Sequence, residues 1–208
     1  MNDNPPACAA KTIQFWFDFG SNYSYLSAMR IEEAAARHGV RVVWKPFLLG
    51  PIFRSFGWEA SPFVLQKEKG EYVWQDMVRL CRKYGLPWKK PGTFPRNAML
   101  AHRVALLASD KPWIGEFCQQ IMRLNFAFDQ DIGSEAVVRE VLRQLGQPAD
   151  EVVAAAQSDA NKLRLREQTE AAKAKGIFGA PTFFVGDEMY WGNDRLDDAL
   201  EDAAAGSA

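Results

Sequence analysis

Ser21 and Ser24 are the residues whose type and place in this sequence point most clearly to chemistry. They follow an apolar, aromatic-rich run over residues 13–19 that ends at Gly20, and they open a segment of helical periodicity. The first turn of a helix has unpaired N–H groups and a partial positive charge, which favour an anion such as a thiolate. No cysteine stands in this turn, so a thiolate would have to come from a bound thiol. We therefore expect the Ser21 hydroxyl to hold the sulfur of that ligand, although the same hydroxyl could act only as a helix cap.

The three cysteines supply no redox pair. Cys8, Cys81 and Cys118 are widely spaced and form no C-x-x-C motif, which argues against a disulfide framework or a zinc site and indicates a reducing cytosol. Cys81 and Cys118 fall in apolar-periodic stretches and are expected to be buried packing residues. Cys8 belongs to the N-terminal tail. The spacing excludes a dithiol oxidoreductase.

The composition is that of an ordinary globular protein without a strong field of either sign. The 208 residues include 25 basic and 26 acidic side chains, with a net charge of −1. No basic field for nucleic acid or an anionic membrane is present. Residues 1–11 lack the pattern of a secretory signal, and the run over residues 13–19 is too short to span a bilayer. We expect a cytoplasmic protein with no membrane or nucleic-acid partner.

The order of expected elements predicts an α/β fold. Strands are expected over residues 12–19 and 40–48, on either side of a helix over residues 23–38, which forms a parallel βαβ unit with a right-handed crossover. A loop over residues 50–62 leads into a block dominated by helical periodicity, with helices expected over residues 63–84, 97–108, 112–128, 134–145 and 149–175. The chain then returns to short strands over residues 182–185 and 189–191, and to a helix over residues 195–203.

This order is that of a thioredoxin-like βαβ…ββα sheet with a helical domain inserted in its middle. Residues 12–49 and 177–204 would form the discontinuous sheet domain, and residues 50–176 the all-helical insertion. In folds of this kind a cis-proline lies beside the start of the active helix, and Ala180-Pro181 opens the third expected strand. The backbone of Ala180 would then be free to pair with an extended peptide. Asn193, which is also a good N-cap for the last helix, and Asp194 could hold charged groups of that peptide.

Four segments give the chain a family resemblance. They are FDFGSNYSYL, KGEYVWQDM, GIFGAPTFFV and WGNDRL, in this order. The chain resembles the 2-hydroxychromene-2-carboxylate isomerases, which belong with the kappa-class glutathione transferases to the DsbA-like branch of the thioredoxin superfamily. The resemblance extends from about Ile13 to Leu200. Asn22 departs from it, since many members carry proline there, and Val64 stands where a polar residue is expected.

The resemblance implies a glutathione site and names its residues. Ser21 would contact the glutathione sulfur, and Ala180 beside Pro181 would pair with the cysteinyl backbone. Asn193 and Asp194 would hold the γ-glutamyl group. Lys69 would neutralise the glycyl carboxylate, although it could equally be a solvated lysine on a helix of mixed charge.

Other polar residues have weaker signals. Asp18 is a carboxylate in an aromatic strand, for which we expect a structural hydrogen-bonding role rather than acid–base catalysis. His38 and His102 have no partner at metal-ligand spacing, so no metal is expected. Arg96, Asn97 and Trp58 are candidates for lining the pocket of a carboxylate-bearing aromatic substrate.

The resemblance implies an isomerase that interconverts 2-hydroxychromene-2-carboxylate and trans-o-hydroxybenzylidenepyruvate in the degradation of aromatic compounds. A thiolate adds reversibly to the conjugated double bond, which permits rotation without net redox change. The alternatives are a kappa-like glutathione transferase or peroxidase, and a peptide-binding module without chemistry. By analogy with the family, and because the chain is rich in tryptophan and phenylalanine, we also expect a homodimer.

Overall fold

The computed structural model describes residues 11–206, and its centre is a mixed four-stranded sheet. The strands are β1 (Thr12–Phe17), β2 (Arg41–Pro46), β3 (Thr182–Val185) and β4 (Glu188–Trp191), in the spatial order β2-β1-β3-β4. β1 pairs in parallel with β2 and antiparallel with β3, and β3 pairs antiparallel with β4. The four strands form one sheet and β1 and β2 run parallel, as the sequence predicts for a thioredoxin-like fold of the α/β class.

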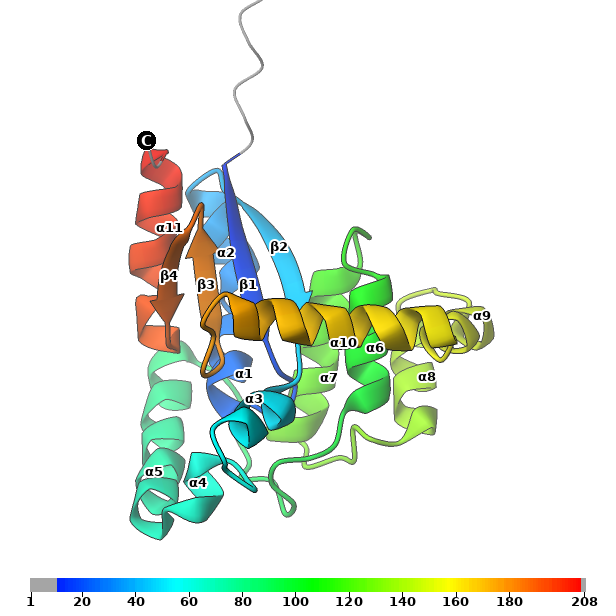
Figure 1. Ribbon diagram of the computed structural model, residues 1–208, viewed down its shortest axis with the longest axis horizontal. Coiled ribbons are helices and arrows are strands. Elements are labelled where there is room, and N and C mark those ends of the chain that lie inside the picture. Colours follow the sequence, from blue (N-terminus) through cyan, green and yellow to red (C-terminus); the bar gives the residue numbers. More distant parts are fainter. Residues whose placement is uncertain (1–10, 207–208) are drawn as a thin grey trace, which may run out of the picture.

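The helices surround this sheet and extend to one side of it (Figure 1). Those of the first half are α1 (Asn22–Ala28), α2 (Ile31–Arg37), α3 (Leu49–Ser55), α4 (Pro62–Leu65), α5 (Lys67–Tyr84) and α6 (Met99–Leu107). Those of the second half are α7 (Ile114–Phe126), α8 (Glu135–Gln144), α9 (Ala149–Ala156), α10 (Asp159–Ala174), the 3-10 helix η1 (Asn193–Arg195) and α11 (Leu196–Ala205). None of the helices within residues 11–206 has the length and apolarity needed to cross a membrane.

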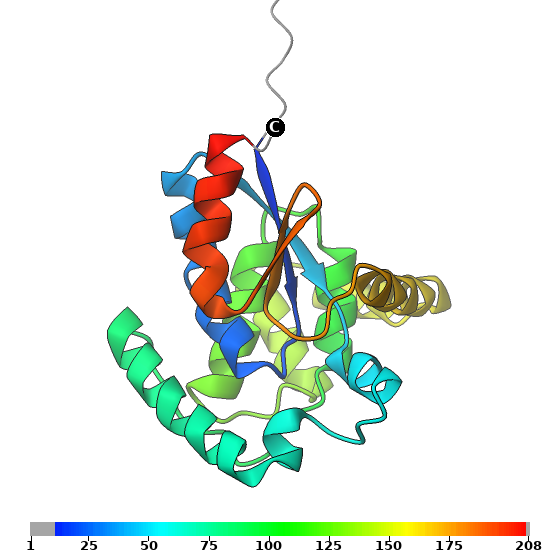
Figure 2. The same ribbon diagram turned by 60° about the vertical axis from the view of Figure 1, so that its left-hand side comes forward.

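Alternation along β1 sends its side chains into two separate cores. Ile13, Phe15 and Phe17 lie in the larger core, to which α1, α2, α11 and the helices from α5 to α9 contribute. Trp16 points to the opposite face and packs in a smaller core with residues of α3, α10 and β3. The view turned by 60° shows α2 and α11 on one side of the sheet, with α10 on the other (Figure 2).

The structure divides three of the expected helices and adds one. Residues 23–38 form α1 and α2, residues 63–84 form α4 and α5, and residues 149–175 form α9 and α10. The last break follows from a local cap, because Ser158 is extended and its side chain accepts the N–H of Asn161, which starts a new helix.

The added helix, α3, occupies part of the predicted loop over residues 50–62. Pro51 is acceptable there because it stands in the first turn, where its missing N–H is not needed. The N–H of Leu49, at the start of α3, donates to Asp18 Oδ2 at 2.9 Å. A carboxylate from the end of β1 therefore caps a helix that local sequence does not predict.

Candidate active site

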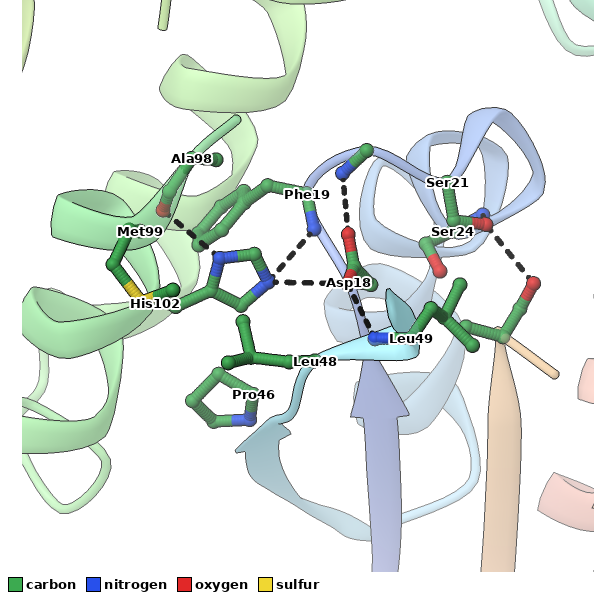
Figure 3. A network of polar contacts seen from close by, with 12 residues as sticks. Asp18, Phe19, Ser21, Ser24, Pro46, Leu48, Leu49, Ala98, Met99 and His102 are labelled. Carbon is green, nitrogen blue, oxygen red and sulfur yellow. Dashed lines mark hydrogen bonds and ion pairs between the residues drawn. The ribbon is translucent and has the colours of Figure 1, made fainter. Parts of the chain in front are cut away.

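The Ser21 hydroxyl joins two segments that are far apart in the sequence. Ser21 is the N-cap of α1, and its Oγ accepts the N–H of Ser24 at 3.1 Å. The same hydroxyl donates to the carbonyl oxygen of Ala180 at 2.9 Å (Figure 3). Ser21 is 7% exposed. The two alternative roles expected for this hydroxyl are thus compatible, since it caps the helix and faces the Ala180–Pro181 segment at once.

The Ala180–Pro181 peptide bond is cis, as expected, and lies beside the active turn. The carbonyl oxygen of Pro181 accepts the N–H of Gly192 at 3.0 Å, which ties the segment after β4 to the same place. Gly192 has φ +110°, and a Cβ there would lie 2.5 Å from Asp194 Oδ1. Glycine is required at this position because any side chain would be strained and would displace the Asp194 carboxylate.

Asn193 and Asp194 have different surroundings. Asn193 is 5% exposed, and its Oδ1 accepts hydrogen bonds from Ser27 Oγ at 3.1 Å and Arg30 Nη1 at 3.4 Å. It is the first residue of η1 rather than the cap of the last helix, so the expected capping role is wrong. Its amide oxygen is instead bound to α1 and the turn that follows it. Asp194 is more exposed and lies 3.4 Å from Arg195 in an ion pair.

A cavity of about 1310 Å³ brings the residues named from the sequence together. Ser21, Lys69, Ala180, Pro181, Asn193 and Asp194 all line it. Lys69 is exposed on α5, and its ammonium group lies 5.9 Å from the centre of the Phe63 ring.

Asp76 is a carboxylate of this cavity that the sequence reasoning missed. Its Oδ2 accepts the hydroxyl of Tyr23 at 2.8 Å, and both side chains line the cavity. Burial and the bond to Asp76 raise the pKa of Tyr23 far above its ordinary value, so Tyr23 is a hydrogen-bond donor and not a base. Within residues 11–206 no ion pair joins Asp76 to a basic side chain. The sequence did contain a signal for Asp76. It follows Lys69 by seven residues, which is about two helical turns, so both side chains lie on one face of the helix.

Asp18 binds three elements together behind the active turn (Figure 3). Its Oδ1 accepts the N–H of Gly20 at 2.7 Å and its Oδ2 that of Leu49 at 2.9 Å, while His102 Nε2 lies 3.6 Å from Oδ2. Burial by itself raises the pKa of Asp18, but His102 and the N–H groups of Leu49 and Gly20 together lower it below its usual range. The carboxylate is therefore ionised and fully engaged, which agrees with the structural role expected for it.

Arg96 is held by neighbouring loops. Its guanidinium donates to Asn125 Oδ1 at 3.0 Å and also binds Asp129, and its side chain is 10% exposed. The N–H of Gly92 together with Arg96 lowers the pKa of Asp129 to about 2. Arg96 and Asn97 line the cavity, but Trp58 does not; it lies against Phe53, which does.

The described cysteines offer no nucleophile. Cys81 and Cys118 are buried, as expected; burial raises the pKa of the Cys81 thiol to about 11, and it also raises the pKa of the Cys118 thiol well above its usual range. Cys8 lies outside the described residues.

Asn22, beside Ser21, is fully buried, and both polar atoms of its side chain have no hydrogen-bond partner. No group of His, Cys, Asp and Glu side chains in the described part of the chain is arranged to hold a metal ion.

Comparisons with known proteins show the family and the fold of this chain. The family model of the DSBA-like thioredoxin domain matches residues 12–204. A 2-hydroxychromene-2-carboxylate isomerase of Pseudomonas putida is 30% identical over 190 residues, which cover 88% of this chain and 90% of that protein. Glutathione S-transferase kappa 2 of Caenorhabditis elegans is 28% identical over 207 residues, covering 89% of this chain and 88% of the relative.

A solved structure of a 2-hydroxychromene-2-carboxylate isomerase superposes with a TM-score of 0.83 at 27% identity, over 93% of this chain and 94% of that one. The similarity thus extends over sheet and helical insertion alike. The chain belongs to the DsbA-like thioredoxin family, in the branch that holds the 2-hydroxychromene-2-carboxylate isomerases and the kappa-class glutathione transferases.

Proposed function

We propose that this protein is a glutathione-dependent isomerase that acts on a conjugated aromatic carboxylate of the 2-hydroxychromene-2-carboxylate type. The observation that carries the proposal is the hydrogen bond from Ser21 to Ala180 beside the cis-proline, in a cavity to which residues 11–206 contribute no thiol. Cys81 and Cys118 are buried with raised pKa values. The thiolate of the reaction is therefore brought by the ligand.

The charged side chains of the cavity match the charges of glutathione, which has two carboxylates and one ammonium group. Lys69 and Lys83 on α5 and Arg195 on η1 offer positive charge to the carboxylates. Asp76 and Asp194 offer negative charge to the ammonium group. Asp76 is the better suited of the two, because Asp194 already has Arg195 as its partner. The backbone of Ala180, whose carbonyl oxygen accepts the Ser21 hydroxyl in this structure, can pair with the cysteinyl residue, as in strand addition, once that hydroxyl turns to the sulfur.

The protein's part in the chemistry is to favour the thiolate over the thiol. The bound thiol supplies the nucleophile, which adds reversibly to the conjugated double bond of the substrate and so permits rotation about it. In this structure the Ser21 hydroxyl donates to the carbonyl oxygen of Ala180. It can rotate to donate to the sulfur instead, while its oxygen still accepts the N–H of Ser24. A hydrogen bond to the charged form lowers the pKa of the thiol.

The test is a glutathione-dependent absorbance assay with 2-hydroxychromene-2-carboxylate, run beside 1-chloro-2,4-dinitrobenzene as a generic transferase substrate. Isomerisation that requires glutathione but does not consume it supports the proposal. Consumption of glutathione with the second substrate alone would assign the protein to the transferases instead. A protein that binds glutathione and turns over neither would be a binding module.

The relatives named as kappa-class transferases favour the second candidate, a transferase or peroxidase with the same glutathione site. The two activities would share Ser21, Ala180 and Lys69 and differ in the part of the cavity that receives the electrophile.

A further inference from the structure

The part of the cavity on the α3 side of the active turn contains a cation without a partner. The Lys and Arg side chains that line the cavity, in the part of the chain described, are Arg54, Lys69, Lys83, Arg96 and Arg195. Lys69 and Lys83 lie on α5, and Arg195 pairs with Asp194 and Asp198. Arg96 is bound to Asn125 and Asp129. Arg54 differs from these side chains. Within residues 11–206 its guanidinium makes no hydrogen bond or ion pair with another residue.

The Arg54 side chain folds back along its own helix toward the start of that helix. Its Nη1 lies 3.5 Å from the point where a Cβ of Gly50 would stand, and Gly50 is one turn earlier in α3. Gly50 follows Leu49, whose N–H is bound to Asp18 Oδ2, and Asp18 Oδ1 accepts the N–H of Gly20. A single carboxylate therefore fixes the start of α3 against the turn that carries Ser21. The guanidinium lies over that end of the helix.

The cavity lining at the start of α3 is mostly apolar. Leu48, Leu49, Pro51 and Phe53, within α3 or directly before it, line the cavity. Phe53 is backed by Trp58, with ring centres 5.9 Å apart. A flat aromatic ring fits such a lining, and a guanidinium suits a carboxylate because it can donate two parallel hydrogen bonds to it. Glu59 also lines the cavity, and no ion pair joins it to Arg54.

We propose that Arg54 binds the carboxylate of the aromatic substrate and makes this end of the cavity selective for aromatic acids over neutral aromatic electrophiles. The inference rests on the proposed function, because it assigns the second subsite of the same site. It differs from the sequence-based expectation, which named Arg96 for this pocket. Arg54 binds and orients the substrate, and Ser21 donates its hydrogen bond to the glutathione sulfur.

The experiment measures binding apart from turnover. Trans-cinnamate and its neutral amide, cinnamamide, are titrated by calorimetry into the protein, into Arg54→Gln and into Arg79→Gln, with S-methylglutathione present because its blocked sulfur cannot react. Arg79 is exposed on α5 and does not line the cavity, so it is the matched control. We expect Arg54→Gln to weaken cinnamate binding about ten- to hundredfold, the range for a charge-assisted hydrogen bond. Cinnamamide binding should be unchanged, and Arg54→Lys should recover part of the loss.

Two results would overturn the inference. One is a wild type that binds cinnamate no more tightly than cinnamamide, and the other is an Arg54→Gln variant that loses both ligands equally or neither. Failure of the proposed function looks different, because the wild type would then not isomerise 2-hydroxychromene-2-carboxylate in the presence of glutathione, whichever aromatic ligand it binds. In the absorbance assay Arg54→Gln should raise KM for the carboxylate substrate, and Arg79→Gln should not.

Discussion

The Ser21 hydroxyl donates to the carbonyl oxygen of Ala180 at 2.9 Å, across 159 residues of sequence. The two residues come from opposite ends of the chain, one at the start of α1 and the other before β3. The hydroxyl is thereby held at the point where a peptide paired with Ala180 would present its cysteine sulfur.

Ser21→Ala should separate glutathione binding from glutathione activation. The substitution removes the donor to the sulfur but leaves Lys69 and Asp76 to hold the rest of the peptide. A charge-assisted hydrogen bond is worth roughly 1.5–3 kcal/mol, so turnover should fall about ten- to hundredfold. The pKa of bound glutathione, followed by thiolate absorbance, should rise, and the affinity should change less.

The control for this prediction is Ser24→Ala. Ser24 Oγ is buried without a hydrogen-bond partner, so its removal should affect turnover little. If Ser21→Ala left both turnover and thiolate absorbance unchanged, Ser21 would be only a helix cap.

Asp76→Asn should weaken glutathione binding through the ammonium group. The carboxamide keeps an acceptor for Tyr23 but loses the negative charge, and the dissociation constant measured by calorimetry should rise about tenfold or more. A glutathione analogue without the α-amine should bind the protein and the variant equally well. Glu71→Gln is the matched control, because Glu71 is exposed on the same helix and does not line the cavity. Equal losses for glutathione and the analogue would contradict the assignment.

Asp18→Asn should destabilise the fold at neutral pH. An amide in place of the carboxylate turns an N–H group toward Gly20 or Leu49, whose own N–H groups need acceptors, and the free energy of unfolding should fall by about 1–3 kcal/mol. The pKa of Asp18 is lowered in the folded protein, so its stabilising effect is present above the unfolded pKa of about 3.9 and is lost as the pH falls through the folded value.

This pH dependence is measured by urea unfolding of the protein and of Asp18→Asn at a series of pH values from neutral into the acid range. The difference in midpoint should be constant near neutrality and shrink below about pH 4. Asp110→Asn, at an exposed position, should show no such difference. A gap between protein and variant that widens in acid would contradict an ionised Asp18.

The protein should form a homodimer in solution. The warrant is analogy with the family, together with large apolar side chains that remain exposed on the single chain, among them Trp191, Tyr72 and Phe178. Light scattering at micromolar concentration measures the mass directly, and a monomer there would refute the expectation.

The order of strands and helices and the residues of the active turn could be predicted from the sequence. Apolar periodicity and the Gly and Pro breaks are local signals, and they predicted the four strands of the sheet. The cis-proline and Ser21 were found together because each belongs to a recognisable segment. α3 could not be found in this way, since its cap is Asp18, which contacts Leu49 across 31 residues.

The tertiary structure alone decided which polar side chains are engaged and which remain available. Arg96 and Arg54 have the same chemistry in the sequence, yet Arg96 is bound to Asn125 and Asp129, while Arg54 folds over Gly50 at the cavity wall. Asn193 is likewise bound by Ser27. The availability of a charge depends on its neighbours in space, and loops and helices distant in the sequence supply those neighbours. The sequence by itself therefore determined the four strands, most of the helical segments and the Ser21 hydroxyl at the start of α1, and the packing of those elements decided the rest of the site.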